Sequence, residues 1–169
     1  MLLAEDHRLM REGTRQFLER ESDIQVVGEA GDGEEAIRLA EALKPDVAII
    51  DIGMPRVNGV AATRAIKKSC PDTAVLILTM YDDDQYVVAL LEAGAAGYLL
   101  KDIGSAELVE AVRNVYAGEA VIHPAITRKV LARLIPRTEK EKPGLGEPLS
   151  GREVEVLRMA AQGLGNKEI

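Results

Sequence analysis

Polar side chains that could do chemistry follow four short apolar runs of the sequence. In chain order they are Glu5 with Asp6, Asp51, Thr79 and Lys101. Carboxylates gathered at one place repel one another, so such a cluster calls for a hard divalent cation such as Mg²⁺ and for a basic partner. With both present, Asp51 becomes a carboxylate nucleophile for a phosphoryl group, and aspartyl phosphate is the expected product.

The elements that must position these residues alternate along the first 120 residues. Continuous apolar runs predict strands at 2–4, 24–27, 47–50, 74–78 and 97–100. Helical periodicity predicts helices at 7–20, 33–43, 57–68, 83–93 and 105–117. Five strand–helix units in a row predict an α/β fold with a doubly wound parallel sheet. Because ligands of such sheets bind at the carboxyl ends of the strands, the polar residues are expected to meet at one edge.

Composition excludes several classes of protein. The chain has 169 residues, and the absence of a run of about 18 apolar residues argues against a transmembrane helix. The single cysteine, Cys70, and the lack of a signal-like N-terminus predict a cytoplasmic protein. Aromatic residues make up 3% of the chain, too few for the sugar groove of a glycosidase. Residues 1–120 carry 12 basic and 22 acidic side chains, so this part should not grip nucleic acid itself.

A different organisation begins after Gly118. Residues 124–135 predict one more helix, in a segment where basic residues exceed acidic ones. Residues 136–149 are rich in Pro, Gly, Lys and Glu, which is typical of a linker. A capping box over 150–153 then predicts a further helix near the end of the sequence.

The polar residues stand in motifs that resemble the receiver domain of two-component response regulators. The motifs are Leu-Leu-Ala-Glu5-Asp6-His7, Asp51-Ile-Gly-Met-Pro-x-x-Asn-Gly59, Leu-Ile-Leu-Thr79 and Gly97-Tyr-Leu-Leu-Lys101. The resemblance implies a flavodoxin-like sheet of five strands in the order 2-1-3-4-5. It also implies that a sensor histidine kinase or a small phosphodonor phosphorylates Asp51, and that the protein is a phosphoprotein rather than an enzyme acting on other substrates.

Individual roles follow from the same resemblance. Magnesium, or manganese in its place, would be held by Asp6, Asp51 and the backbone carbonyl of Gly53, with Glu5 acting through water. The phosphoryl group would be bound by Lys101 and Thr79. The switch residues would be Thr79 and Tyr98, and the lifetime of the phosphoryl group would depend on Gly53 and Tyr81.

A second resemblance covers the end of the chain. Residues 149–169 are similar to the start of the LuxR-type helix-turn-helix domain of NarL/FixJ regulators. The expected division is a receiver at 1–120, a linker helix and flexible linker at 121–148, and the beginning of an all-α DNA-binding domain at 149–169. The resemblance implies transcription regulation through a homodimer formed on phosphorylation. Because the recognition helix would follow residue 169, the parent protein is expected to bind DNA and this fragment is not.

Two other functions stay open at this point. An aspartate-nucleophile phosphatase would need a second Asp two residues after Asp51, where this chain has Gly53. A module binding FMN or NAD would use the Gly-x-Gly-x-x-Ala pattern at 31–36, but its acidic residues oppose a pyrophosphate. The acids at 82–84 are expected to begin a helix, and His7 and His123 are expected to lack carboxylate or cysteine partners for zinc.

Overall fold

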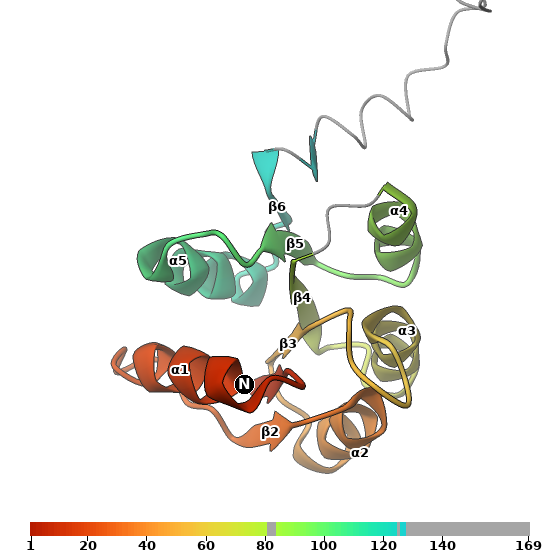
Figure 1. Ribbon diagram of the computed structural model, residues 1–169, viewed down its shortest axis with the longest axis horizontal. Coiled ribbons are helices and arrows are strands. Elements are labelled where there is room, and N and C mark those ends of the chain that lie inside the picture. Colours follow the sequence, from red (N-terminus) through yellow and green to blue (C-terminus); the bar gives the residue numbers. More distant parts are fainter. Residues whose placement is uncertain (81–83, 125, 128–169) are drawn as a thin grey trace, which may run out of the picture. The chain divides into compact units, whose positions relative to one another are not determined.

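A six-stranded parallel sheet with helices on both faces forms the described part of the chain (Figure 1). The computed structural model describes residues 1–80, 84–124, 126 and 127. The strands, in chain order, are β1 (Leu2–Ala4), β2 (Gly28–Ala30), β3 (Val47–Ile50), β4 (Ala74–Thr79), β5 (Gly97–Leu100) and β6 (Val121–Ile122). The helices are α1 (Arg8–Leu18), α2 (Gly33–Leu43), α3 (Gly59–Ser69), α4 (Asp84–Glu92) and α5 (Ser105–Tyr116). The strand order is β2-β1-β3-β4-β5-β6, which confirms the predicted doubly wound α/β fold.

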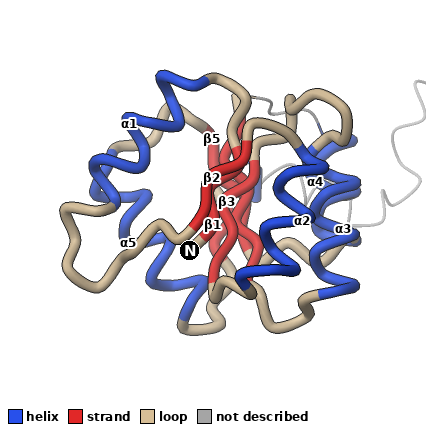
Figure 2. Tube along the Cα trace, turned by 90° about the horizontal axis from the view of Figure 1, so that it is seen from below, coloured by secondary structure: helices blue, strands red, loops and turns tan. Residues whose placement is uncertain are grey.

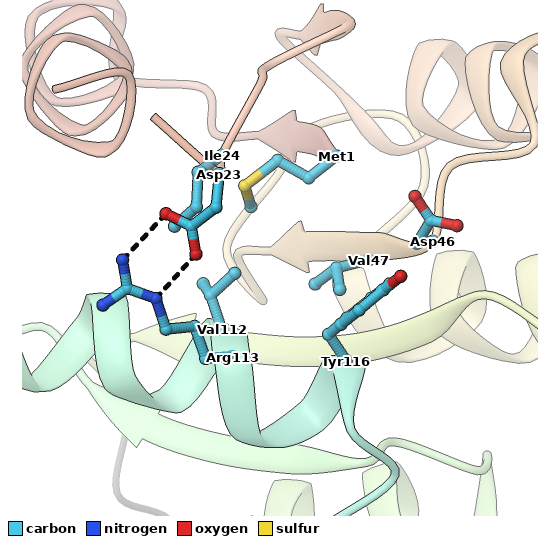
Figure 3. A pocket seen from close by; sticks show the side chains of 8 residues that line it. All are labelled: Met1, Asp23, Ile24, Asp46, Val47, Val112, Arg113 and Tyr116. Carbon is cyan, nitrogen blue, oxygen red and sulfur yellow. Dashed lines mark hydrogen bonds and ion pairs between the residues drawn. The ribbon is translucent and has the colours of Figure 1, made fainter. Parts of the chain in front are cut away.

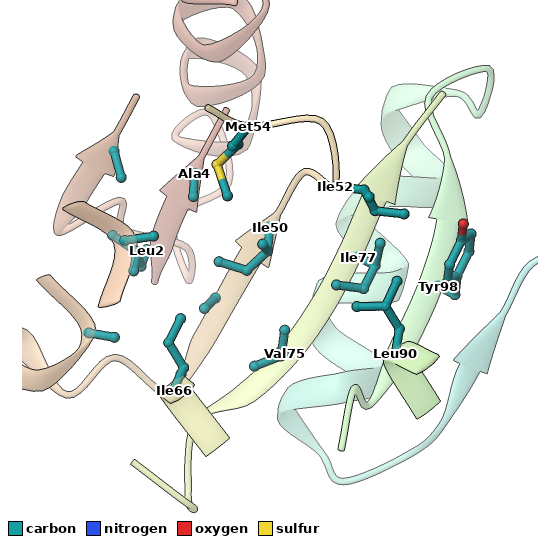
Figure 4. Packing of buried hydrophobic residues seen from close by; sticks show 14 of the residues in the cluster. Leu2, Ala4, Ile50, Ile52, Met54, Ile66, Val75, Ile77, Leu90 and Tyr98 are labelled. Carbon is teal, nitrogen blue, oxygen red and sulfur yellow. The ribbon is translucent and has the colours of Figure 1, made fainter. Parts of the chain in front are cut away.

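The helices divide between the two faces of the sheet, with α1 and α5 on one side and α2, α3 and α4 on the other (Figure 2). Each face buries its own apolar cluster because the strands alternate their side chains. Figure 4 shows part of the cluster beneath α2, α3 and α4, where Ile50, Ile77 and Tyr98 come from neighbouring strands. Burial on both faces explains the continuous apolar runs in the sequence.

Glycines and caps set the ends of the helices. The side chain of Asp32 accepts a hydrogen bond from Glu35 N at 2.9 Å and begins α2, and Asn58 accepts one from Ala61 N at 3.0 Å and begins α3. Gly94 and Gly118, just after α4 and α5, have φ of 91° and 86°, a conformation that glycine adopts without strain. Among the residues that the structure describes, no helix is long and apolar enough to cross a bilayer.

The predicted strand at 24–27 is wrong, because the second strand is Gly28–Ala30. The backbone of Val27 donates to Met1 O at 2.9 Å, and the regular pairing with β1 starts only at Gly28. The strand consists of Gly28, Glu29 and Ala30, so it has no apolar run to mark it.

A sixth strand extends the five-stranded sheet that the resemblance implied. Strand β6 pairs in parallel with β5, and Tyr98 lies opposite Ile122. The chain then enters a helical turn, in which Ile126 is fully buried in the same cluster as Tyr98. The first residues after α5 thus dock on the sheet, while the rest of the predicted helix at 124–135 lies outside the described residues.

Candidate functional site

The carboxyl ends of the strands bring the charged residues together at one rim of the sheet. Beyond the last paired residues, Glu5 N donates to Ala30 O at 3.0 Å and Asp51 N donates to Ala4 O at 3.0 Å. On the other side of the site, Lys101 N donates to the backbone oxygen of Thr79 at 2.9 Å. These bonds extend the sheet by one residue and fix where the side chains leave the backbone.

Lys101 is the cation at the centre of this rim. Its Nζ lies 2.6 Å from Glu5 Oε2 and 3.0 Å from Asp51 Oδ2, and all three side chains are at most 6% exposed. Burial lowers the pKa of Lys101, but the hydrogen bond to Glu5 and the charge of Asp51 outweigh burial and leave this pKa raised above its usual value. The ammonium therefore stays charged and ties two strand ends together.

Asp6 carries the carboxylate that is least satisfied. Its Oδ1 is buried and, among the described residues, has no hydrogen-bond partner of good geometry, although His7 Nδ1 lies 3.0 Å away. The same His7 nitrogen is 3.2 Å from Glu5 Oε1. The expectation that His7 lacks carboxylate partners is therefore wrong, because the turn from β1 into α1 brings three consecutive side chains together.

The oxygen atoms of Asp51 are held in two directions. Oδ1 accepts a hydrogen bond from Ile52 N at 2.8 Å, while Oδ2 faces Lys101. Behind Asp51, the chain folds back so closely that a Cβ on Gly59 would lie 2.2 Å from Asp51 O. Gly53 is an exposed residue of this loop between β3 and α3. The loop thus begins and ends next to the backbone of Asp51.

The two predicted switch residues lie inside the sheet next to this rim. Thr79 is the last residue of β4 and is fully buried. Tyr98 is also fully buried, and in β5 it pairs with Ile77 of β4. Tyr81, which the resemblance linked to the lifetime of a phosphoryl group, lies outside the described residues, as do Asp82 and Asp83.

Three carboxylates and one ammonium leave the rim with an excess of negative charge. The residues are Glu5, Asp6, Asp51 and Lys101. A divalent cation would balance this excess and would bind Asp6 Oδ1, which accepts no hydrogen bond among the described residues. The donor set of carboxylate oxygens therefore fits magnesium or manganese.

A hollow of the described surface lies away from this rim. A cavity of about 340 Å³ opens at the amino-terminal ends of the strands, beside Met1, Asp46 and Val47 (Figure 3). Arg113 of α5 closes one side of it through hydrogen bonds of 2.8 Å to both carboxylate oxygens of Asp23. Since the charged rim is at the opposite ends of the strands, this cavity plays no part in its chemistry.

Comparisons with known proteins agree with this geometry. Residues 1–113 match the family described as "Response regulator receiver domain", and residues 147–169 match "Bacterial regulatory proteins, luxR family". The transcriptional regulatory protein DegU of Brevibacillus brevis is 40% identical over 182 aligned positions, which cover 100% of this chain and 77% of that protein.

Solved structures show the same likeness. A LuxR-family two-component response regulator from Aurantimonas sp. SI85-9A1 is 36% identical with a TM-score of 0.74, covering 78% of this chain and 94% of that one. A structure of two RcsB dimers bound to two parallel DNAs is 26% identical with a TM-score of 0.70, covering 99% of this chain and 78% of that one.

Proposed function

Because this chain belongs to the response regulators of two-component systems, with a receiver domain and a LuxR-type DNA-binding segment, we propose that it accepts a phosphoryl group on Asp51. The observation that carries the proposal is the Lys101 ammonium, which lies 3.0 Å from Asp51 Oδ2. A fixed cation beside a buried carboxylate is placed where the charge of a transferred phosphoryl group would develop. The family consists of regulators rather than classical enzymes, so the chemistry proposed is limited to forming and hydrolysing this one bond.

Magnesium, or manganese, is the cofactor that we propose for this reaction. Asp6, Asp51 and the carbonyl of Gly53 would hold the ion, and Glu5 would act through water. The support from this chain is the orphaned, buried Oδ1 of Asp6 together with the excess negative charge of the rim. When bound, the ion would neutralise phosphoryl oxygens that three carboxylates otherwise repel.

Asp51, Lys101 and Thr79 would each have a separate part in the phosphoryl transfer. A carboxylate oxygen of Asp51 forms a bond to phosphorus while the bond from phosphorus to the donor breaks, and the donor leaves with that electron pair. The hydrogen bond from Ile52 N to Oδ1, at 2.8 Å, fixes the orientation of the carboxylate. Lys101 would then exchange its contact with Asp51 for one with a phosphoryl oxygen, and the Thr79 hydroxyl would bind another.

Signal transfer is proposed to be a shift between two populations. Phosphorylation would favour the state in which Thr79 and Tyr98 rearrange the surface made by α4, β5 and α5. Gly53 and Tyr81 would tune how long that state lasts.

The proposed partners follow from the family. A sensor histidine kinase would donate the phosphoryl group, and phosphorylation would favour a homodimer in the cytoplasm. The relative RcsB is described as dimers bound to DNA, and we propose that the full-length regulator also binds DNA as a dimer. Two output domains held together would each bind one half-site, so the dimer would bind DNA more tightly than a single domain does.

Labelling with radioactive acetyl phosphate tests the proposed phosphoacceptor. The wild-type chain should take up the label only when Mg²⁺ or Mn²⁺ is present, and Asp51→Asn should abolish uptake. Asp72→Asn, which alters an exposed acid after α3, is the matched control and should label normally. Labelling of Asp51→Asn at another residue, at the wild-type rate, would overturn the assignment.

A further inference from the structure

The loop between β3 and α3, residues 52–58, is anchored at both ends next to Asp51. At its close, Gly59 N donates to Ile52 O at 3.0 Å, and Asn58 caps α3. Between these anchors the side chain of Met54 is buried in the core, whereas Gly53 and Arg56 are exposed. The position of the Gly53 carbonyl therefore depends on Met54 and on what holds the exposed part of the loop.

The N-terminus of α2 supplies that hold. A Cβ on Gly33 would lie 2.0 Å from Val57 O, so the helix start and the loop backbone touch directly. This contact fills the space that a pyrophosphate would need above the Gly-x-Gly pattern. The loop and α2 therefore form one packed unit although they are far apart in sequence.

An ion pair joins the same two elements. The carboxylate of Asp32 is 2% exposed and pairs with the guanidinium of Arg56, whose Nε also lies 3.7 Å from Glu34 Oε2. The other oxygen of Asp32 is used to cap α2. Without Arg56, a buried carboxylate would lose its cation.

Arg56 makes this pair from a strained backbone. Its φ is 63°, in the left-handed region that costs a residue with a Cβ about 1 kcal/mol or more. Glycine would adopt this conformation without that cost. The pair with Asp32 offsets part of this cost.

We propose that Arg56 is a positioning residue for the phosphoacceptor site, acting through Asp32 to hold the loop that carries the Gly53 carbonyl. The inference rests on the proposed function, because it assumes that this carbonyl and Asp51 hold a divalent ion. Groups that orient metal ligands typically change metal affinity by about 10-fold to 100-fold when removed. We expect a change near the lower end, since the loop keeps both of its end anchors.

Arg56→Gly separates positioning from charge. It relieves the strained backbone but leaves Asp32 without its cation, so these two effects on stability oppose each other, and the unfolding midpoint is measured beside the affinity. It also removes a positive charge, which by electrostatics alone would tighten the binding of a cation. Positioning predicts the opposite, a Mn²⁺ dissociation constant raised roughly tenfold.

The experiment titrates the full chain with Mn²⁺, following the free ion by electron paramagnetic resonance. Arg56→Lys should keep part of the affinity, and the control Arg38→Ala, which removes an exposed arginine of α2, should bind as the wild type does. Asp32→Asn keeps a capping side chain but loses the pair, so Arg56→Gly and Asp32→Asn should not add in the double variant. Wild-type affinity in Arg56→Gly, or additive effects in the double variant, would overturn the inference.

Failure of the proposed function would look different. In that case the wild-type chain itself would neither bind Mn²⁺ at the rim nor label at Asp51. Normal labelling of wild-type Asp51 together with unchanged Mn²⁺ binding in Arg56→Gly would overturn the role of Arg56 alone.

Discussion

Replacing Lys101 with methionine should show how much the Lys101 ammonium stabilises the fold. The variant keeps the length of the side chain but removes the ammonium that lies 2.6 Å from Glu5 Oε2 and 3.0 Å from Asp51 Oδ2. Each of these charge-assisted hydrogen bonds contributes about 1.5–3 kcal/mol, and removing one partner of a buried ion pair costs about 3–5 kcal/mol. Both arguments predict that Lys101→Met lowers the free energy of unfolding by about 3–5 kcal/mol at pH 7.5 without divalent ions.

The raised pKa of Lys101 makes this stabilisation depend on pH. Because the pKa of Lys101 is raised in the fold, its contribution is complete below the usual value of 10.5 and is lost as the pH rises through the higher folded value.

Magnesium should partly replace the missing ammonium. The rim of Lys101→Met has one more uncompensated negative charge, and tenfold tighter binding would add about 1.4 kcal/mol to the stabilisation that saturating Mg²⁺ gives. Urea unfolding followed by circular dichroism, at pH 7.5 with and without saturating Mg²⁺, measures the loss of stability and its recovery by the ion.

Lys67→Met is the matched control for these measurements. The Nζ of Lys67 binds the backbone carbonyls of Pro71 and Thr73, at 2.5 and 2.9 Å, rather than carboxylates. Its cost should therefore not depend on Mg²⁺. A loss below about 1 kcal/mol in Lys101→Met would refute the assignment of Lys101 as the cation of a buried charge cluster.

Two further predictions concern the rest of the fold. Ile126→Ala should lower the free energy of unfolding, measured in urea, by about 2–5 kcal/mol, because the side chain is fully buried in the same apolar cluster as Tyr98; a surface-like cost below about 1 kcal/mol would contradict that docking. Hydrogen bonds from Arg113 hold the pKa of Asp23 near 2, so this group stabilises the fold above about pH 4 and ceases to do so as the pH falls through 2. Urea midpoints should fall less between pH 4 and pH 2 in Arg113→Gln than in the wild type, and equal falls would show that the pair is not formed in solution.

The rim could be predicted from the sequence because a parallel sheet imposes it. Once buried runs mark the strands, the residues after them share one edge, and the structure does bring Glu5, Asp51 and Lys101 into contact. The second strand could not be found in the same way. Its Glu29 faces α1 and pairs with Arg15, so at this edge of the sheet an ion pair stands where the pattern would require an apolar residue.

Contacts that depend on turns were also beyond the sequence. His7 reaches Glu5 and Asp6 only because the chain reverses direction between β1 and α1, and spacing rules for metal ligands do not describe three consecutive residues. The pair of Asp32 with Arg56 requires two loops to meet and a residue with φ of 63°, which no periodicity indicates. Strand β6 has two residues, too few to give a pattern at all.

Strand β5 links the chemistry at the rim to the segment that follows α5. It carries Tyr98, it leads directly into Lys101, and the backbone of Lys101 is bonded to Thr79 of β4. On its other side, His123 N donates to Tyr98 O at 2.9 Å. If Lys101 exchanges Asp51 for a phosphoryl group, as proposed above, its movement would act on a strand that is bonded to both its neighbours. Because a packed interior resists gradual deformation, we expect such a displacement to reach the edge strand β6, which pairs with β5.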